Sequence, residues 1–382
     1  MTTPTTTTRT GINVRLTIAI PTVNRAGLLG RAIESALAQT SADIEIIVSD
    51  NGSTDDTPSV IARYAERYAG HSAGRALRSF RHPSTMSAAK HGQFLIEQAR
   101  GEFFLGLSDD DFLEPEFAAE VLAMFDRRPD LSFVYTGCAV HYEDCQVPAV
   151  VGPAVEAGPS FLAAHYADQR EVSWCACATR VRDLLELGPQ PEDRILGDMF
   201  FWTKLAFRGP VGCIPRVLSH YVLLRSQNDN ISHGTAPAVW ARESQSLANE
   251  VIEASRRAGV DSDSLSRLQA DCRRHIARSA ANQFVWTRLR GADPAQAWSW
   301  VAECLPYLSL SLSPVVLSRL IASLVLPRET LRRLLLTGAA RLARARSTTK
   351  AYEGEANIRS AADDAPGSCP LHAGKRRAGA GL

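Results

Sequence analysis

The sequence lacks the features that mark several large classes of protein. Its 382 residues carry a net charge of only +1, so it has no overall positive charge with which to attract nucleic acid, and we predict no nucleic-acid partner. The eight cysteines include no Cys-x-x-Cys pair, which argues against a zinc site, and a chain of this length has little need of a disulfide framework. No clean run of about 20 uncharged apolar residues, the length that spans a membrane, is present.

The two ends of the chain are dominated by small and polar residues. Residues 1–13 have neither the basic nor the apolar region of a signal peptide, and we predict a disordered leader there. Residues 347–382 are rich in Ala, Gly and Ser, which predicts a disordered tail. Without an export signal or a spanning segment, the folded part is expected to be cytoplasmic.

Between residues 14 and 111, short apolar runs alternate with segments of helical periodicity. The predicted strands are 16–20, 44–48, 76–81 and 102–107, and the predicted helices are 28–37, 59–68 and 88–99. Such an alternation is typical of an α/β fold with a doubly wound, largely parallel sheet and flanking helices.

The pattern is more irregular from residue 112 onward. We predict helices at 115–125, 182–187 and 198–208, extended segments at 132–140, 172–179 and 212–222, and a loop at about 142–159. From residue 237 the periodicity is helical to about residue 346, without a further strand signal. The sequence therefore predicts an α/β domain at 14–235, with halves at 14–111 and 112–235, and a helical extension at 236–346.

Three polar clusters follow predicted strands, at residues 21–25, 50–55 and 108–111. In a doubly wound sheet, ligands bind outside the carboxyl ends of the strands, so these clusters are expected to line one crevice. The last cluster contains three adjacent aspartates, whose mutual repulsion a cation would relieve. Mg²⁺ and Mn²⁺ take oxygen ligands, usually one or two carboxylates together with substrate phosphates. The pattern therefore predicts a divalent metal held against a diphosphate.

Each of these acidic residues also has a purely structural interpretation. The acidic run could begin a helix, with Pro115 at the first helical position and the carboxylates near the positive end of the helix dipole. Asp50 could be a turn residue, and Asp198 could cap the helix that it begins.

Several ordered segments together resemble a family 2 glycosyltransferase with the GT-A fold. They are the first strand and its Pro-Thr-x-Asn-Arg turn at 16–25, the segments at 35–40 and 45–55, the acidic region at 107–115, the Gly-Asp pair at 197–198 and the closing segment at 225–232. The resemblance covers about residues 15–235. It implies that residues 14–111 form the nucleotide-binding half and residues 112–235 the acceptor half.

The resemblance implies a nucleotide-sugar donor and assigns residues to it. Asp50 is implied to hydrogen-bond the nucleobase, while the turn at 21–25 closes around the base and the ribose. We expect Lys90 or Arg225 to supply the positive charge near the diphosphate. The implied nucleotide-sugar-binding residues are Pro21, Thr22, Asn24, Arg25, Asp50, Asn51, Lys90, Asp109, Asp110 and Arg225.

The resemblance also implies how the reaction is catalysed. Asp109, Asp110 and Asp111 are implied ligands of a Mg²⁺ or Mn²⁺ ion, which offsets the charge that develops on the leaving nucleoside diphosphate. Asp198 is implied to be the general base that takes the proton of an acceptor hydroxyl, so that direct displacement inverts the anomeric centre. The acceptor expected from the family is a glycan or a lipid-linked glycan of the cell envelope or capsule.

Three positions depart from the family pattern. Ser108 stands where the first Asp of the acidic motif is common, which leaves open which aspartate is the main metal ligand. Gly197 replaces the usual Glu before the base, unless Glu192 or Asp193 reaches the site. Gln227 replaces a His near the diphosphate and cannot offer a cationic imidazolium.

Two other functions are compatible with the sequence. The departures from the pattern would suit a non-catalytic sugar-nucleotide-binding or scaffold protein of the same fold. A nucleotidyltransferase would share the sheet architecture, but such an enzyme usually has a Gly-rich first loop with Arg or Lys, which residues 21–27 do not resemble.

Residues 301–346 are both apolar and basic. An apolar stretch at 315–326 is followed, beyond Pro327, by arginines that alternate with leucines. A basic amphipathic helix can lie in the interface of an anionic membrane, which would make the protein peripheral on the inner face of the plasma membrane. A packed helix with a solvated basic face and a homodimer interface are the alternatives.

Overall fold

The structure is a computed structural model that describes most of the chain. The described residues are 14–68, 76–141, 146–223, 236–289, 299–300, 302–304, 307, 314–327 and 330–331. The predicted leader at 1–13 and the predicted tail at 347–382 lie outside them, as do Arg225 and Gln227.

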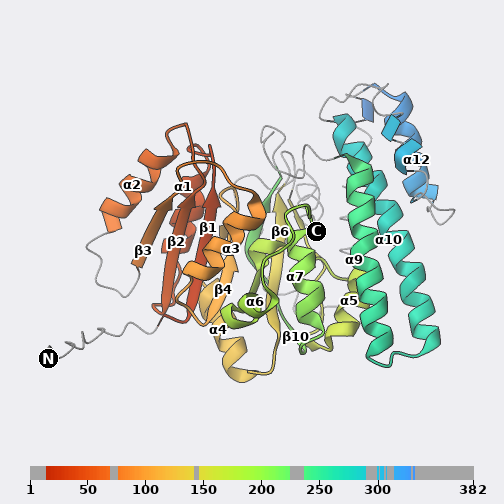
Figure 1. Ribbon diagram of the computed structural model, residues 1–382, viewed down its shortest axis with the longest axis horizontal. Helices are drawn as coiled ribbons and strands as arrows, with labels where there is room; N and C mark the ends of the chain where they lie inside the picture. The colour runs from red at the N-terminus through yellow and green to blue at the C-terminus, as the bar shows by residue number, and fades with distance from the viewer. Residues whose placement is uncertain are drawn as a thin grey trace, which may run out of the picture.

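A mixed sheet forms the centre of the molecule (Figure 1), and its first half is parallel as predicted. Strands β1 (Leu16–Thr22), β2 (Ile44–Asp50), β3 (Ala76–Arg81) and β4 (Phe103–Gly106) lie in the order β3-β2-β1-β4. Helices α1 (Leu29–Leu37), α2 (Thr57–Tyr68) and α3 (Ala88–Gln98) connect them. All seven residues of β2 are buried, because helices cover both faces of the sheet, and this explains its nearly continuous apolar sequence.

The second half of the sheet is mixed rather than parallel. Its strands are β5 (Phe112–Leu113), β6 (Phe133–His141), β7 (Gln146–Pro148), β8 (Val155–Glu156), β9 (Cys177–Arg180) and β10 (Val211–Val222). Strand β9 runs antiparallel to both β4 and β6, so β4 and β6 point the same way, and β10 is parallel to β6. Strands β1, β2, β3, β4, β6 and β10 therefore all end at one edge of the sheet.

Two sequence predictions in this half were wrong in part. The predicted loop at 142–159 contains β7, β8 and the start of helix α5 (Gly158–Tyr166), because strands of two or three residues are too short to show a periodicity. The predicted strand at 172–179 begins only at Cys177, since a 3-10 turn, η1 (Trp174–Ala176), precedes it. Helices α4 (Phe117–Arg127), α6 (Val181–Leu187) and α7 (Gly197–Ala206) lie close to the predicted ranges.

The sheet separates two apolar cores. In β1, Ile18 and Ile20 pack in the core that contains α1 and α4, while Ala19 faces the core that contains α3, α5 and α7. This alternation follows from the period of two in a strand, which places neighbouring side chains on opposite faces.

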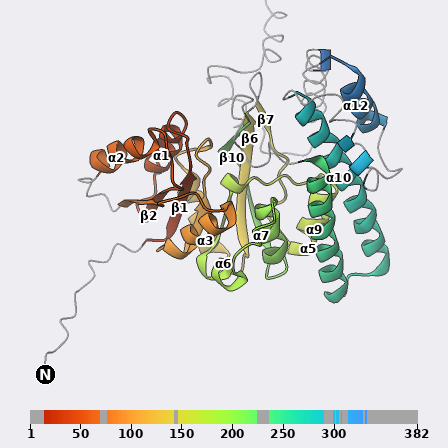
Figure 2. The same cartoon turned by 45° about the horizontal axis from the view of Figure 1, so that its top comes forward.

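The predicted helical extension is present as helices α9 (Pro237–Arg257), α10 (Ser262–Leu289) and α12 (Pro314–Val325). Helices α9 and α10 lie side by side beside α5 and α7 in both views (Figures 1 and 2), and Leu247 and Ile276 share a core with Phe161 and Leu205. A hydrogen bond of 3.0 Å between His275 Nδ1 and Asp168 Oδ1 adds a polar contact to this apolar interface. Among the described residues, no helix is long and apolar enough to span a membrane.

Candidate active site

The three polar clusters predicted from the sequence lie at the same edge of the sheet. In the parallel register, Thr22 at the end of β1 is paired with Asp50 at the end of β2, and Asp50 is paired with Arg81 at the end of β3. The acidic run follows β4, the other neighbour of β1. The expected crevice is therefore built by strands that end side by side.

The turn after β1 is tied to the loop after β2 by local hydrogen bonds. Asn24 has a φ of 54°, a left-handed conformation that Asn tolerates better than most residues. Its backbone N–H donates to Ser53 Oγ at 2.8 Å, and its side-chain Oδ1 accepts from the Thr54 backbone N–H at 2.8 Å. The Arg25 backbone N–H donates to Thr57 Oγ1 at 3.0 Å. These bonds fix Pro21 and its neighbours beside Asp50.

Asp50 is a buried carboxylate with one oxygen that accepts no hydrogen bond. Only 1% of its surface is exposed, and its Oδ1 accepts from the Ser53 backbone N–H at 2.9 Å. Its Oδ2 is buried without a hydrogen-bond partner, although Arg81 Nε lies 3.4 Å away. A buried acceptor of this kind is rare unless something else completes it. The sequence analysis missed Arg81, which only the strand register could have revealed.

Two of the predicted binding residues have other partners. The side chain of Asn51 bonds both backbone groups of Met86, at 3.0 Å each, so it holds the segment before α3 in place. Lys90 forms an ion pair of 2.9 Å with Glu192, and Ser87 Oγ donates to the same carboxylate at 2.9 Å. Glu192 is thus bound to residues at the start of α3 and does not take the place of the Glu that is usual at position 197.

The acidic run is buried where β4 ends. Thr22 Oγ1 donates to Asp109 Oδ2 at 2.7 Å, and the Arg25 guanidinium lies 3.9 Å from Asp110 Oδ2. Arg31 donates to the backbone oxygen of Asp110 at 2.7 Å. The pKa of Asp109 is raised to about 7, chiefly by burial and also by the charge of Asp110, against the lowering effects of Thr22 and Arg25. Burial also raises the pKa of Asp110.

Asp111 is directed differently from its two neighbours. It is 1% exposed, and its Oδ1 accepts from the Val222 backbone N–H of β10 at 2.9 Å. Burial raises its pKa well above the usual value, and the charge of Asp110 adds to this. The Asp111 carboxylate therefore connects the acidic run to β10.

The carboxylate oxygens of the acidic run suit a hard cation that is also bound by the phosphates of a substrate. Within the described ranges, no group of three or more His, Cys, Asp or Glu side chains is arranged to hold a metal ion. Magnesium, however, usually takes only one or two carboxylates and completes its shell with water and substrate phosphates. Asp109 and Asp110 offer such a pair, and burial, the main cause of their raised pKa values, disfavours their charged forms, which a bound cation would stabilise.

Asp198 lies in the first turn of helix α7. Its Oδ1 accepts from the Met199 backbone N–H at 2.7 Å, and burial is the main cause that raises its pKa to about 6. Burial also raises the pKa of the Tyr221 phenol, and the charges of Asp111, Asp110 and Asp198 raise it further. Tyr221, near the end of β10, is thus close to both carboxylate groups.

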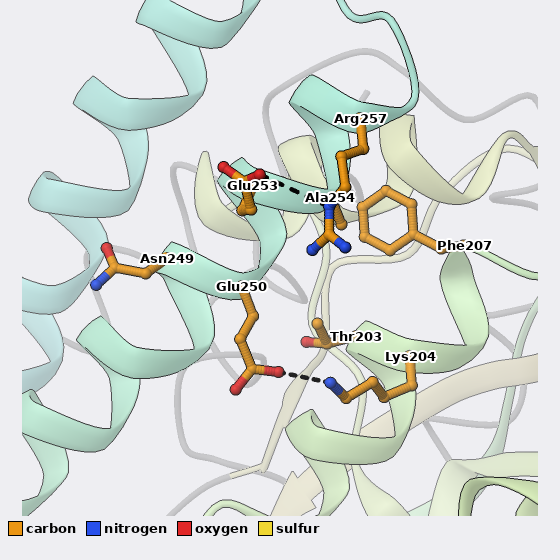
Figure 3. A pocket seen from close by; sticks show the side chains of 8 residues that line it. All are labelled: Thr203, Lys204, Phe207, Asn249, Glu250, Glu253, Ala254 and Arg257. Atoms are coloured by element: carbon orange, nitrogen blue, oxygen red, sulfur yellow. Dashed lines mark hydrogen bonds and ion pairs between the residues drawn. The ribbon is translucent and has the colours of Figure 1, made fainter.

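A groove of about 590 Å³ lies elsewhere, between α7 and α9 (Figure 3). It is at the opposite end of α7 from Asp198. Its charged groups are paired with each other, Lys204 with Glu250 at 2.7 Å and Arg257 with Glu253 at 3.7 Å. None of the residues predicted to bind the nucleotide sugar lines it, so the residues at the carboxyl ends of β1, β2 and β4 form the candidate active site.

The first half of the chain is similar to known glycosyltransferases. Residues 17–145 match the family described as glycosyl transferase family 2. The chondroitin synthase of Escherichia coli is 36% identical over 121 residues, which are 32% of this chain and 17% of that enzyme. A GalNAc(5)-diNAcBac-PP-undecaprenol beta-1,3-glucosyltransferase of Campylobacter jejuni is 35% identical over 100 residues, or 26% of this chain and 30% of that enzyme. The chain thus matches less than a third of the length of either relative.

A solved structure extends the likeness over most of the fold. The crystal structure of S. aureus TarS 1–349 in complex with UDP matches with a TM-score of 0.54 at 14% identity, and the match covers 85% of this chain and 92% of that one. At this identity the likeness concerns the fold alone. The chain therefore has the GT-A fold, and its residues 17–145 are similar to glycosyl transferase family 2.

Proposed function

We propose that this chain is an inverting glycosyltransferase that moves a sugar from a nucleoside-diphosphate donor to a hydroxyl acceptor. The observation that supports the proposal is that Asp50 and the acidic run lie at the carboxyl ends of β2 and β4, the two strands that pair with β1, while Tyr221 lies near both the acidic run and Asp198. In this proposal Asp50 recognises the base, the acidic run binds the diphosphate, and Asp198 removes the proton.

The nucleobase binds to Asp50 in this proposal. The free Oδ2 of Asp50 accepts a hydrogen bond from a ring N–H, and Arg81 beside it donates to a carbonyl oxygen of the base. Uracil, thymine and guanine carry a ring N–H next to a carbonyl oxygen, whereas adenine and cytosine do not. The turn at 21–25 covers the base and the ribose, since Asn24 joins it to the loop that follows Asp50.

Asp109 and Asp110 would hold a Mg²⁺ or Mn²⁺ ion together with the diphosphate. Such an ion supplies a positive charge that offsets the negative charge of the leaving group. Arg25, which lies 3.9 Å from Asp110 Oδ2, adds a second positive charge on the same side. Asp111 has a structural role in this proposal, because its carboxylate already accepts from the Val222 backbone. Lys90, paired with Glu192, is less suited to meet the diphosphate than Arg25.

Asp198 acts as the general base. With a pKa near 6, its carboxylate is mostly ionised at neutral pH and still basic enough to accept a proton. As the acceptor hydroxyl loses its proton to Asp198, its oxygen bonds to the anomeric carbon. The bond from that carbon to the diphosphate oxygen breaks on the opposite side, and the electron pair leaves with the diphosphate. The result is inversion.

The acceptor we propose is a glycan or a lipid-linked glycan of the cell envelope. This rests on two relatives whose names describe a chondroitin synthase and a glucosyltransferase that acts on an undecaprenol-linked glycan. Attachment to an anionic membrane on its cytoplasmic side would bring the enzyme to such an acceptor. Part of the predicted membrane segment supports this, because α12 exposes Leu317, Ile321 and Val325 at 45%, 52% and 66%. Residues four apart share one helix face.

The membrane proposal has a direct test. Replacement of Leu317, Ile321 and Val325 by Ser should reduce sedimentation of the full chain with vesicles that contain anionic lipid, because the buried apolar area is lost. Sedimentation equal to that of the wild type would contradict the proposal. A homodimer that uses the same face would instead appear as a change in oligomeric state without a change in vesicle binding.

The catalytic proposal is tested by Asp198→Asn, with Asp193→Asn as the control. Asp193 is an exposed carboxylate in the segment before α7, so its substitution makes the same charge change nearby. Asp198→Asn should lower kcat by about 100-fold or more while donor affinity is kept, and Asp193→Asn should behave as the wild type. Lost donor affinity in Asp198→Asn would mean that this carboxylate has another role. A wild-type chain that binds nucleoside diphosphate but transfers no sugar would favour the scaffold alternative.

A further inference from the structure

The segment that leads into the Asp198 helix is held by a carboxylate of the helical extension. Glu243 lies on α9 and is only 9% exposed. Its Oε2 accepts from the Ile195 backbone N–H at 2.8 Å, and its Oε1 accepts from the Leu196 backbone N–H at 2.9 Å. These two N–H groups immediately precede α7, whose N-terminus carries a partial positive charge. Both oxygens of one buried carboxylate are therefore used to fix the backbone two and three residues before Asp198.

The same segment has a glycine at position 197, and a side chain there would require Gln190 to move. A Cβ on Gly197 would collide with the side-chain oxygen of Gln190, and Gln190 Nε2 donates to the Arg194 backbone oxygen at 2.9 Å. Of the two alternatives in the sequence, Glu192 bonds to Ser87 at 2.9 Å, and Asp193 is exposed. The negative charge next to the base therefore comes from α9 instead of from the segment itself.

We propose that Glu243 is a positioning residue for the Asp198 base, so that the helical extension is part of the catalytic unit. The inference rests on the function proposed for Asp198. Glu250, two turns further along α9, supports the same segment, because it accepts from Arg194 at 2.6 Å and from Lys204 at 2.7 Å. Unlike Glu250, Glu243 bonds the backbone of this segment directly. These bonds fix the orientation of the first turn of α7.

Glu243 also acts on Asp198 through its charge. Burial is the largest cause of the raised pKa of Asp198, and the negative charge of Glu243 adds to it. Within the described part of the chain, Cys177 on β9 and Tyr221 on β10 also lie near Asp198, since the charge of Asp198 raises the pKa of each. Both are neutral at neutral pH. Removal of the Glu243 charge should therefore lower the pKa of Asp198 and move the acid limb of the pH–rate profile to lower pH.

The test compares three variants of the full chain. Glu243→Gln should lower kcat by about 10- to 100-fold with little change in donor KM, because the base is misplaced, and its acid limb should move to lower pH. Glu243→Asp keeps the charge but shortens the side chain, so kcat should fall while the acid limb stays. Glu253→Gln makes the same charge change at an exposed position of α9 and should match the wild type. A wild-type kcat in Glu243→Gln, or a lowered kcat with an unmoved limb, would overturn the inference.

Two further measurements test the inference if Glu243→Gln does not fold or if the wild type is inactive. If Glu243→Gln does not fold, Glu243→Asp decides alone, because a wild-type kcat in that variant contradicts the positioning role. If the wild type transfers sugar from no donor, the proposed function has failed, and the pKa of the Asp198 carboxyl is then followed by carbon-13 NMR in the wild type and in Glu243→Gln. A lower pKa in the variant retains the link between Glu243 and Asp198, and an equal pKa refutes it.

Discussion

Substitution of Asp50 by Asn probes the base-binding end of the crevice with almost no change in shape. In the structure, Oδ1 is bonded to the Ser53 backbone and can keep that bond. The change falls on Oδ2, which is buried without a hydrogen-bond partner and becomes an NH₂ group. A ring N–H of the base would then meet a donor instead of a charged acceptor. The new NH₂ group would also lie beside the Arg81 guanidinium.

The expected loss follows from the value of a hydrogen bond to a charged group. Such a bond contributes about 1.5–3 kcal/mol, which corresponds to an increase in Kd of about 10- to 150-fold. Isothermal titration calorimetry with UDP, TDP and GDP in the presence of Mn²⁺ would measure it. Asp56→Asn is the control, since Asp56 is an exposed carboxylate in the same loop. A folded Asp50→Asn protein that binds each nucleotide as the wild type does would refute the assignment of Asp50.

Three further predictions concern the acidic run, its neighbours and the base. Thr22→Val removes a hydrogen bond that lowers the pKa of Asp109, so this pKa should rise and more of the carboxyl should be protonated at about pH 7. Metal-dependent nucleotide binding should therefore weaken at about pH 7 and recover at about pH 8.5. Equal weakening at both pH values would contradict this. Gly106→Ala would place a Cβ against the Trp174 indole, so urea unfolding should report a loss of about 1–3 kcal/mol, and an unchanged midpoint would count against the packing. Sugar transfer should fall below about pH 6, because protonation inactivates the Asp198 base; a rate that is constant down to pH 5 would contradict its role.

The sequence predicted the first half of the fold with good accuracy. Apolar runs long enough to fill a buried parallel strand have a clear signal, and β3 at Ala76–Arg81 coincides with its predicted range. The clustering of Thr22, Asp50 and the acidic run followed from one rule, that ligands bind at the carboxyl ends of parallel strands. The register of β1 and β2 brings Thr22 and Asp50 together as this rule requires.

The parts that could not be predicted depend on contacts between distant segments. The direction of β9 is set by its two neighbours, β4 and β6, and not by its own four residues. Arg81 becomes part of the site only through its pairing with Asp50. Glu243 lies 45 positions beyond Asp198 in a helix whose pattern indicates only an amphipathic surface, so nothing local predicts that its carboxylate bonds the segment before α7. The three adjacent aspartates look equivalent in the sequence, yet Asp111 bonds to β10.

Donor consumption by the purified chain tests the central claim most directly. A panel of nucleoside-diphosphate sugars is incubated with the protein and Mn²⁺, with and without a glycan acceptor, and the release of nucleoside diphosphate is followed by mass spectrometry. The structure predicts that at least one donor with a uracil, thymine or guanine base is consumed by the wild type and spared by Asp198→Asn. Consumption of no donor by a protein that binds nucleoside diphosphate, or equal consumption by Asp198→Asn, would contradict the assignment of this crevice as a glycosyltransferase active site.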